Sequence, residues 1–182
     1  KIINAIALSG ADIIEIGMPF SDPMADGPTI QLSSNRAIKQ NISLDNIFLI
    51  CKNFRKNNNN IPIILMGYYN VIFNYGIKKF VHQCSQNGID GLIIVDLQPE
   101  EDSDLLNEIK ETDLDLIRLV TPTTNSERLD KILKNSSGFL YYVTITGITG
   151  QHSANIDELK LSIEKIKTQT KLPIVSGFGI KD

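Results

Sequence analysis

The sequence lacks tryptophan and has only two cysteines and two histidines in 182 residues. Because Cys51 and Cys84 are the only cysteines, neither a disulfide framework nor a thiolate metal site is indicated, and a reducing compartment is expected. His82 and His152 lack metal-ligand spacing, so neither a metal centre nor a Ser–His–Asp site is predicted. No hydrophobic run approaches the roughly 18 residues of a membrane-spanning helix, so this chain is not expected to cross a membrane.

An excess of charge of one sign is also absent. Eighteen Lys and Arg residues stand against 21 Asp and Glu residues, and the net charge is −3. The lysines are scattered, so no basic face would attract a phosphate backbone, and a nucleic-acid partner is not expected. With 42% hydrophobic and 21% charged residues, the composition is that of an ordinary globular domain. No linker divides the chain, which predicts a single domain over residues 1–182.

Short apolar segments alternate with amphipathic segments along the whole chain. We expect helices at 1–8, 44–56, 76–87, 100–110, 126–134 and 157–168. We expect strands at 13–16, 61–66, 91–95, 114–119, 139–144 and 173–176. The strands at 61–66 and 91–95 are apolar without alternation, which indicates a parallel sheet that is covered on both faces.

Two architectures produce such an alternation, an open doubly wound sheet and a closed (β/α)₈ TIM barrel. Unusual residues follow nearly every predicted strand, and only a barrel brings six consecutive strand ends around one mouth. The barrel is therefore favoured. Six strands are two short of closure, so we expect a fragment that lacks the first strand and the last strand with its helix.

The strongest chemical signal extends from residue 15 to residue 31. Glu15 ends a predicted strand between two isoleucines, where burial should raise the pKa of its carboxyl toward that of a general acid or base. Three prolines stiffen the loop that follows and that carries Asp22 and Asp26. Two alternatives remain open: Glu15 is a structural carboxylate paired with a cation, and the aspartates cap backbone amides in a turn-rich connector.

Glycine-rich segments at 146–150 and 176–179 form a second signal. Late loops of a barrel commonly hold phosphate through backbone N–H groups, although each segment alone also fits a tight turn. No lysine lies in a strand core, which disfavours a Schiff-base aldolase.

Several of these segments together resemble the alpha chain of tryptophan synthase. The resemblance rests on motifs in the same order along the whole chain: residues 15–31, 65–70, 93–96, Tyr141 with 146–150, and 176–179. It implies a (β/α)₈ barrel that cleaves indole-3-glycerol phosphate to indole and glyceraldehyde 3-phosphate.

The resemblance also implies a set of site residues. Glu15 matches the catalytic glutamate that moves the proton at C3 of the indole ring, and Asp26 matches the aspartate that accepts a hydrogen bond from the indole N–H. The residues expected to bind substrate are Met66, Tyr68, Tyr141, Thr149, Gly150, Phe178 and Gly179. For Met66 and Tyr68, simple core packing remains the alternative.

The resemblance implies a partner as well. The alpha chain is expected to need no cofactor or metal, and to assemble in an alpha2beta2 heterotetramer with a beta chain that carries pyridoxal phosphate. Met24, at the tip of the proline-rich loop, is expected to be exposed at that interface. An interaction subunit with an inactive site and another phosphate-binding barrel enzyme are the alternatives.

The compartment is predicted from composition. Lysine outnumbers arginine, isoleucine and asparagine are abundant, and residues 121–124 are similar to cyanobacterial sequences. We expect the plastid stroma (chloroplast), with a bacterial cytoplasm as the alternative.

Overall fold

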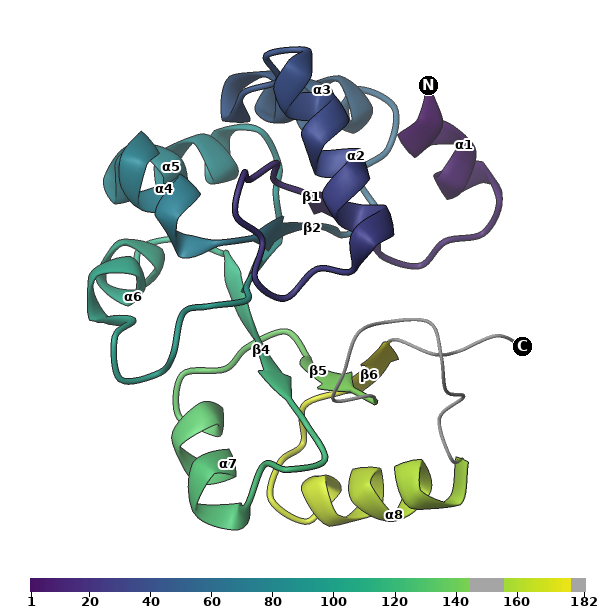
Figure 1. Cartoon of the computed structure of the whole chain (residues 1–182), viewed down its shortest axis with the longest axis vertical. Coiled ribbons are helices and arrows are strands. Elements are labelled where there is room, and N and C mark those ends of the chain that lie inside the picture. Colours follow the sequence, from purple (N-terminus) through teal and green to yellow (C-terminus); the bar gives the residue numbers. More distant parts are fainter. Residues whose placement is uncertain (145–155, 178–182) are drawn as a thin grey trace. The chain divides into compact units, whose positions relative to one another are not determined.

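The computed structural model describes residues 1–144 and 156–177 of the chain. None of the helices in these two ranges combines the length and the hydrophobicity that a membrane span requires. The chain divides into two compact units, residues 1–115 and 116–182, and each has its own sheet strands and helices (Figure 1).

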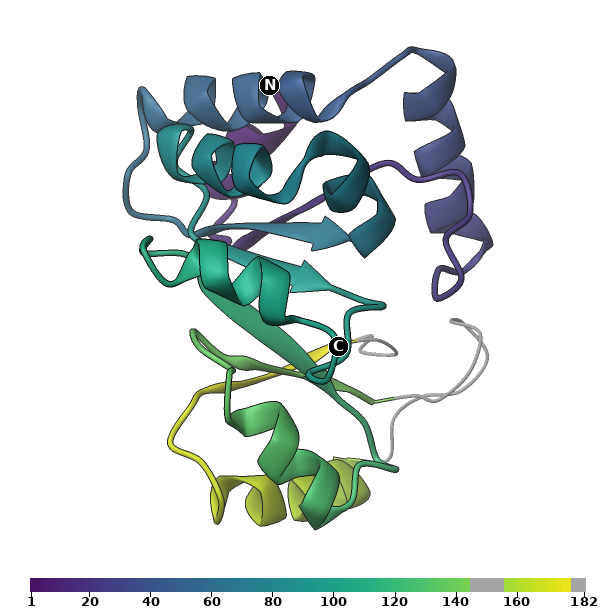
Figure 2. The same cartoon turned by 90° about the vertical axis from the view of Figure 1, so that its left-hand side faces the viewer.

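The first unit contains three parallel strands and six helices among its residues. Its strands are β1 (Ile14–Gly17), β2 (Ile63–Gly67) and β3 (Gly91–Ile94), which pair in chain order. Its helices are α1 (Ile2–Leu8), α2 (Pro28–Lys39), α3 (Leu44–Arg55), α4 (Tyr69–Tyr75), α5 (Ile77–Gln86) and α6 (Ser103–Ile109). Helices α3, α5 and α6 follow one another along one side of the strands, whereas α2 lies beyond the tips of the strand arrows (Figure 2).

The second unit repeats the same alternation. Strand β4 (Asp115–Val120) starts at the boundary and is followed by α7 (Ser126–Leu133), β5 (Leu140–Val143), α8 (Ile156–Lys167) and β6 (Ile174–Gly177). Strands β4, β5 and β6 are parallel and pair in chain order. Its core gathers side chains from every one of these elements, among them Val120, Leu129, Ile132, Leu140, Tyr142, Ile166 and Ile174.

Burial follows from the apolar runs that predicted the strands. Ile63, Ile64 and Leu65 are consecutive and all buried, as are the four residues of β3. Consecutive buried residues on a strand require cover on both faces, and the strands pair in parallel, so the prediction of a parallel sheet covered on both faces is confirmed. All six expected strands occur within about two residues of their predicted bounds.

The two cysteines are core residues. Cys51 on α3 and Cys84 on α5 are fully buried free thiols. Burial raises the pKa of Cys51 to about 11 and raises the pKa of Cys84 as well, so both thiols stay protonated and unreactive. Beside them, the Phe48 ring of α3 lies 5.9 Å from the Phe80 ring of α5. The cysteines therefore belong to the helix packing, as the lack of a motif around them indicated.

Helices α2 and α4 were not expected from the sequence. Helix α2 begins with Pro28 after Gly27, yet none of its residues is buried, and Ile30 and Leu32 are 55% and 60% exposed. Without a buried stripe, its apolar residues do not show the periodicity by which helices are recognised. Helix α4 has only seven residues and stops at Gly76, whose φ is 95°. Ile72 is the only buried residue of α4, so no apolar stripe marks this helix in the sequence.

Arg55 holds together the segments at the amino-terminal ends of β2 and β3. Its Nε donates to the carbonyl of Gly88 at 2.7 Å, and its Nη1 donates to the carbonyl of Ile61 at 2.8 Å. Its remaining nitrogen pairs with the carboxylate of Asp90, which also accepts the N–H of Ile63 at 2.6 Å. This half-buried network ties α3 to the starts of β2 and β3 and so sets the register that aligns their carboxyl ends.

Candidate active site

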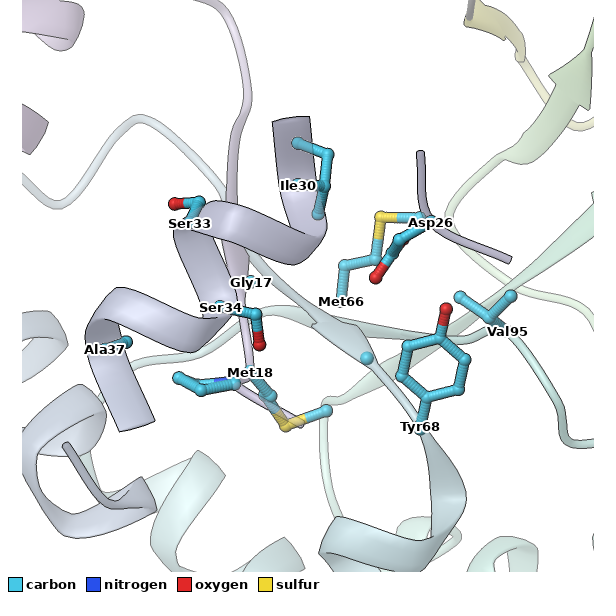
Figure 3. A pocket seen from close by; sticks show the side chains of 12 residues that line it. Gly17, Met18, Asp26, Ile30, Ser33, Ser34, Ala37, Met66, Tyr68 and Val95 are labelled. Carbon is cyan, nitrogen blue, oxygen red and sulfur yellow. The ribbon is translucent and has the colours of Figure 1, made fainter. Parts of the chain in front are cut away.

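A pocket of about 280 Å³ lies at the carboxyl ends of β1, β2 and β3, within the first unit (Figure 3). Its walls come from the strand ends, from the loop after β1 and from α2: Gly17, Met18, Pro19, Asp26, Ile30, Ser33, Ser34, Ala37, Met66, Gly67, Tyr68 and Val95. The carboxyl ends of parallel strands are where barrel enzymes place their chemistry.

Strand register explains why these residues meet. Gly17 is paired with Met66, and Met66 is paired with Ile93, two residues before Val95. Because side chains alternate along a strand, Gly17, Met66 and Val95 occupy the same face of the sheet. Glu15 precedes Gly17 by two residues and shares that face, although it does not line the pocket.

Glu15 lies on β1, where it is the second of four residues and not the last residue of the strand as predicted. Its side chain is exposed to solvent, yet the surrounding protein removes enough water for burial to raise the pKa of its carboxyl. No described cation forms an ion pair with it, so the alternative of a structural carboxylate lacks a partner among the described residues. A carboxyl with a raised pKa and no counterion is suited to carrying a proton.

Asp26 lies in the pocket wall at the end of the loop after β1 (Figure 3). Burial raises the pKa of its carboxyl, and a hydrogen bond from the Tyr68 hydroxyl lowers it in part. No described backbone amide donates to this carboxylate, which disfavours the capping alternative for Asp26. The backbone carbonyl of Asp26 accepts a hydrogen bond from Gln31 Nε2 at 2.8 Å, which joins the loop to α2.

The start of the same loop is fixed by Ser34, which the sequence did not single out. The Phe20 N–H donates to Ser34 Oγ at 2.9 Å, and Ser34 Oγ donates to the Phe20 carbonyl at 3.0 Å. Ser34 became part of the site only through α2, whose presence was not predicted. A serine three residues after Gln31 carries no local signal, so only the helix itself could have revealed it.

Met66 and Tyr68, both expected to bind substrate, lie in the pocket lining. Met66 is partly buried and Tyr68 is nearly fully buried. Their place in the pocket agrees with the expectation, and their contact with substrate stays a prediction. Beyond β3, Asp96 Oδ1 accepts the N–H of Tyr69 at 2.7 Å and thereby links the loop after β3 to the start of α4.

Tyr141 belongs to β5 of the second unit, where it is buried and paired with Val175 of β6. The expected substrate-binding residues Thr149, Gly150, Phe178 and Gly179 lie outside the described residues, as does the whole of segment 146–150. Of the segment at 176–179, Ser176 and Gly177 are described, at the end of β6. The phosphate site that these segments predict therefore stays a prediction.

Position 177 requires glycine because the side chain of Tyr141 lies too close to leave room for a Cβ atom. A Cβ built on Gly177 would lie 2.1 Å from the Tyr141 hydroxyl oxygen and 2.5 Å from the ring carbon that carries it. We expect Gly177→Ala to destabilise the full-length protein by about 1–3 kcal/mol, the usual cost of overpacking, because a buried ring must move. Urea unfolding measures this change. The matched control is Gly17→Ala, since a Cβ there meets nothing within 4 Å. Equal unfolding midpoints for the two variants would contradict the expectation.

The chain is similar to known proteins of one family. Residues 1–182 match the family described as tryptophan synthase alpha chain. A tryptophan synthase subunit alpha from Legionella pneumophila str. Paris is 40% identical with a TM-score of 0.87, and an alpha chain from Legionella pneumophila subsp. pneumophila is 38% identical with a TM-score of 0.85. A tryptophan synthase a2b2 complex from Pyrococcus furiosus contains a chain that is 34% identical with a TM-score of 0.87.

These similarities extend over nearly all of this chain and part of each relative. The matches cover 98% of this chain, and they cover 66% and 64% of the two Legionella chains and 71% of the Pyrococcus chain. The predicted (β/α)₈ barrel is the fold of these relatives and is thereby confirmed. A match over the full sequence, together with relatives at this identity and coverage, shows that the chain belongs to the tryptophan synthase alpha chain family.

Proposed function

We propose that the full-length protein is a carbon–carbon lyase that cleaves indole-3-glycerol phosphate to indole and glyceraldehyde 3-phosphate. The observation that carries this proposal is a pair of carboxylates on β1 and in the loop that follows it, Glu15 without a described counterion and Asp26 in the pocket wall. Both carboxyls have a pKa raised by burial, which is typical of groups that take part in chemistry. Membership of the family supplies the substrate.

The reaction needs a proton at C3 of the indole ring before the carbon–carbon bond can break. The protonated form of Glu15, which the raised pKa of its carboxyl favours, delivers that proton, and the ring becomes a cation with its charge on the nitrogen. The glycerol hydroxyl beside the breaking bond then loses its proton to the Glu15 carboxylate and becomes the aldehyde. The electron pair of the broken bond returns to the ring, which leaves neutral indole.

Asp26 stabilises the positive charge that develops on the ring nitrogen. As a carboxylate it accepts the hydrogen bond from the indole N–H, and this bond strengthens as the ring becomes cationic. Met18, Ile30 and Met66 give the pocket a largely apolar wall, which suits a flat aromatic ring, while Ser33 and Ser34 add polar groups to it. Segments 146–150 and 176–179 are proposed to hold the phosphate through backbone N–H groups.

We further propose that the protein binds a tryptophan synthase beta chain in an alpha2beta2 heterotetramer. Met24, at the tip of the loop after β1, is 82% exposed, as the sequence predicted. A large apolar side chain on a loop that three prolines stiffen is poorly explained by internal packing and suits an interface. The Pyrococcus relative is part of an a2b2 complex. The alpha chain is proposed to use no cofactor or metal of its own, with pyridoxal phosphate on the beta chain.

Met24→Asp should weaken binding of the cognate beta chain at least tenfold, because a charge would replace an apolar contact at the interface. Calorimetric titration of the beta chain into full-length protein measures the dissociation constant. Leu49→Asp, which changes a similarly exposed side chain on the outside of α3, is the control and should bind normally. Equal weakening by both variants, or no heat from the unaltered protein, would contradict the interface.

The plastid stroma is proposed as the compartment on composition, with a bacterial cytoplasm as the alternative. The Legionella and Pyrococcus relatives come from a bacterium and an archaeon, which favours the alternative. Mapping the coding sequence to a plastid or a bacterial genome distinguishes the two.

Incubating the full-length protein with indole-3-glycerol phosphate tests the proposed activity. Release of indole in equal amount to glyceraldehyde 3-phosphate is expected. An interaction subunit with an inactive site would release none, while still raising the activity of the beta chain. A different phosphate-binding barrel enzyme, such as an isomerase, would neither release indole nor bind the beta chain.

A further inference from the structure

Tyr68 connects the end of β2 to the loop that carries Asp26. Its side chain is 3% exposed, and its hydroxyl oxygen accepts the backbone N–H of Ala25 at 3.0 Å. The same hydroxyl donates to the carboxylate of Asp26. Figure 3 shows the hydroxyl of Tyr68 directed toward Asp26 across the pocket wall. Tyr68 therefore contacts the loop through both its donor and its acceptor capacity.

The rest of the loop leaves the Asp26 side chain without another described hydrogen bond. Ser34 fixes the backbone of Phe20 at the start of the loop, and Gln31 holds the carbonyl of Asp26. Neither contact reaches the carboxylate. The Phe20 ring packs against the Tyr68 ring with centroids 5.4 Å apart, which fixes the plane of the phenol and so the position of its hydroxyl. The orientation of the carboxylate thus depends on one hydroxyl group.

The surroundings of the Tyr68 phenol keep its hydroxyl protonated, so the hydroxyl acts as a hydrogen-bond donor. Burial raises the pKa of the Tyr68 hydroxyl most, and the negative charges of Asp26 and Asp96 raise it further. At neutral pH the hydroxyl retains its proton, which it can give only to an acceptor. The carboxylate of Asp26 is that acceptor.

We propose that Tyr68 is a positioning residue that acts through Asp26, besides lining the pocket. By holding the Ala25 N–H and the Asp26 carboxylate together, it aims the carboxylate at the place where the ring nitrogen binds. Its effect on turnover rests on the proposed function. A misplaced charge stabilises the transition state poorly, and small displacements at a reacting centre commonly cost one to two orders of magnitude in rate.

A double-mutant cycle in the full-length protein separates positioning from direct contact with substrate. Tyr68→Phe removes one oxygen and leaves the ring, and we expect it to lower kcat about tenfold while KM changes by less than about threefold. In an Asp26→Ala background, Tyr68→Phe should cause no further loss, because its partner is gone. Tyr69→Phe, the adjacent tyrosine on α4, is the matched control and should keep full activity. If Tyr68→Phe and Asp26→Ala lower kcat by independent factors that multiply in the double variant, the proposal is overturned.

A second readout needs no turnover. Titration of the Asp26 carboxyl, followed by carbon-13 NMR and assigned with Asp26→Asn, should give a higher pKa in Tyr68→Phe than in the unaltered protein, because the lost hydrogen bond favoured the ionised form. Tyr69→Phe should leave that pKa unchanged. If the unaltered protein releases no indole but the pKa still rises, the proposed function fails and the link between Tyr68 and Asp26 stands. An unchanged Asp26 pKa in Tyr68→Phe would overturn the link itself.

Discussion

Glu15→Gln in the full-length protein should lower the rate of indole release by roughly 10²–10⁴, the usual contribution of a positioned proton carrier. The amide keeps the volume and polarity of the side chain but cannot give a proton to C3 or take one from the glycerol hydroxyl. Indole formation from indole-3-glycerol phosphate, measured at saturating substrate, gives the ratio of rates. Retention of more than a tenth of the normal rate would exclude Glu15 as the proton carrier.

The fold of this variant can be checked by its stability. Because burial raises the pKa of Glu15, the folded protein holds this proton more tightly than the unfolded chain does. Ionisation of Glu15 therefore costs folding free energy above the ordinary pKa of glutamate, and its unfavourable effect grows as the pH rises through the folded pKa. Glu15→Gln removes that cost, so its melting temperature at pH 7 should equal or slightly exceed that of the unaltered protein. Glu127→Gln, on the exposed surface of α7, is the control for activity.

Asp26→Asn should lower the rate by about 10²–10³, comparable with the removal of a group that stabilises charge in a transition state. The amide oxygen can still accept the hydrogen bonds from Tyr68 and from the indole N–H, whereas the negative charge is lost. The loss should therefore appear mainly in kcat, measured by steady-state kinetics of indole release.

The same variant separates catalysis from docking. Since Asn keeps the hydrogen bonds of the loop, Asp26→Asn should bind the beta chain nearly as well as the unaltered protein does. A normal rate of cleavage would disprove the electrostatic role of Asp26, and a loss of beta-chain binding equal to that of Met24→Asp would show that the loop itself had changed.

Several features of the site could be read from the sequence because they depend on local patterns. Glu15 stands between two isoleucines, so its place on a short strand followed from its neighbours, although the strand continues for two residues beyond it. Met24 was expected to be exposed because prolines surround it, and its exposure of 82% confirms this. Met66 and Tyr68 came from the resemblance to a family, and both lie in the pocket.

Other features depend on contacts between distant segments, which a local pattern does not show. Ser34 reaches the loop only because α2 places it there, and α2 has no buried stripe that would reveal it. The hydrogen bonds of Tyr68 join residues 43 and 42 positions apart in the chain. Arg55 was not singled out either, because its four acceptors come from separate loops around β2 and β3.

The delivery of a proton to C3 by Glu15 is best tested by running the reaction of the full-length protein in D₂O and analysing the products by mass spectrometry. If Glu15 carries a solvent-exchangeable proton to C3, each indole released will carry one deuterium at C3, in equal amount to glyceraldehyde 3-phosphate, and Glu15→Gln will form neither product above background. Release of indole without deuterium at C3, or equal product formation by Glu15→Gln, would contradict this mechanism.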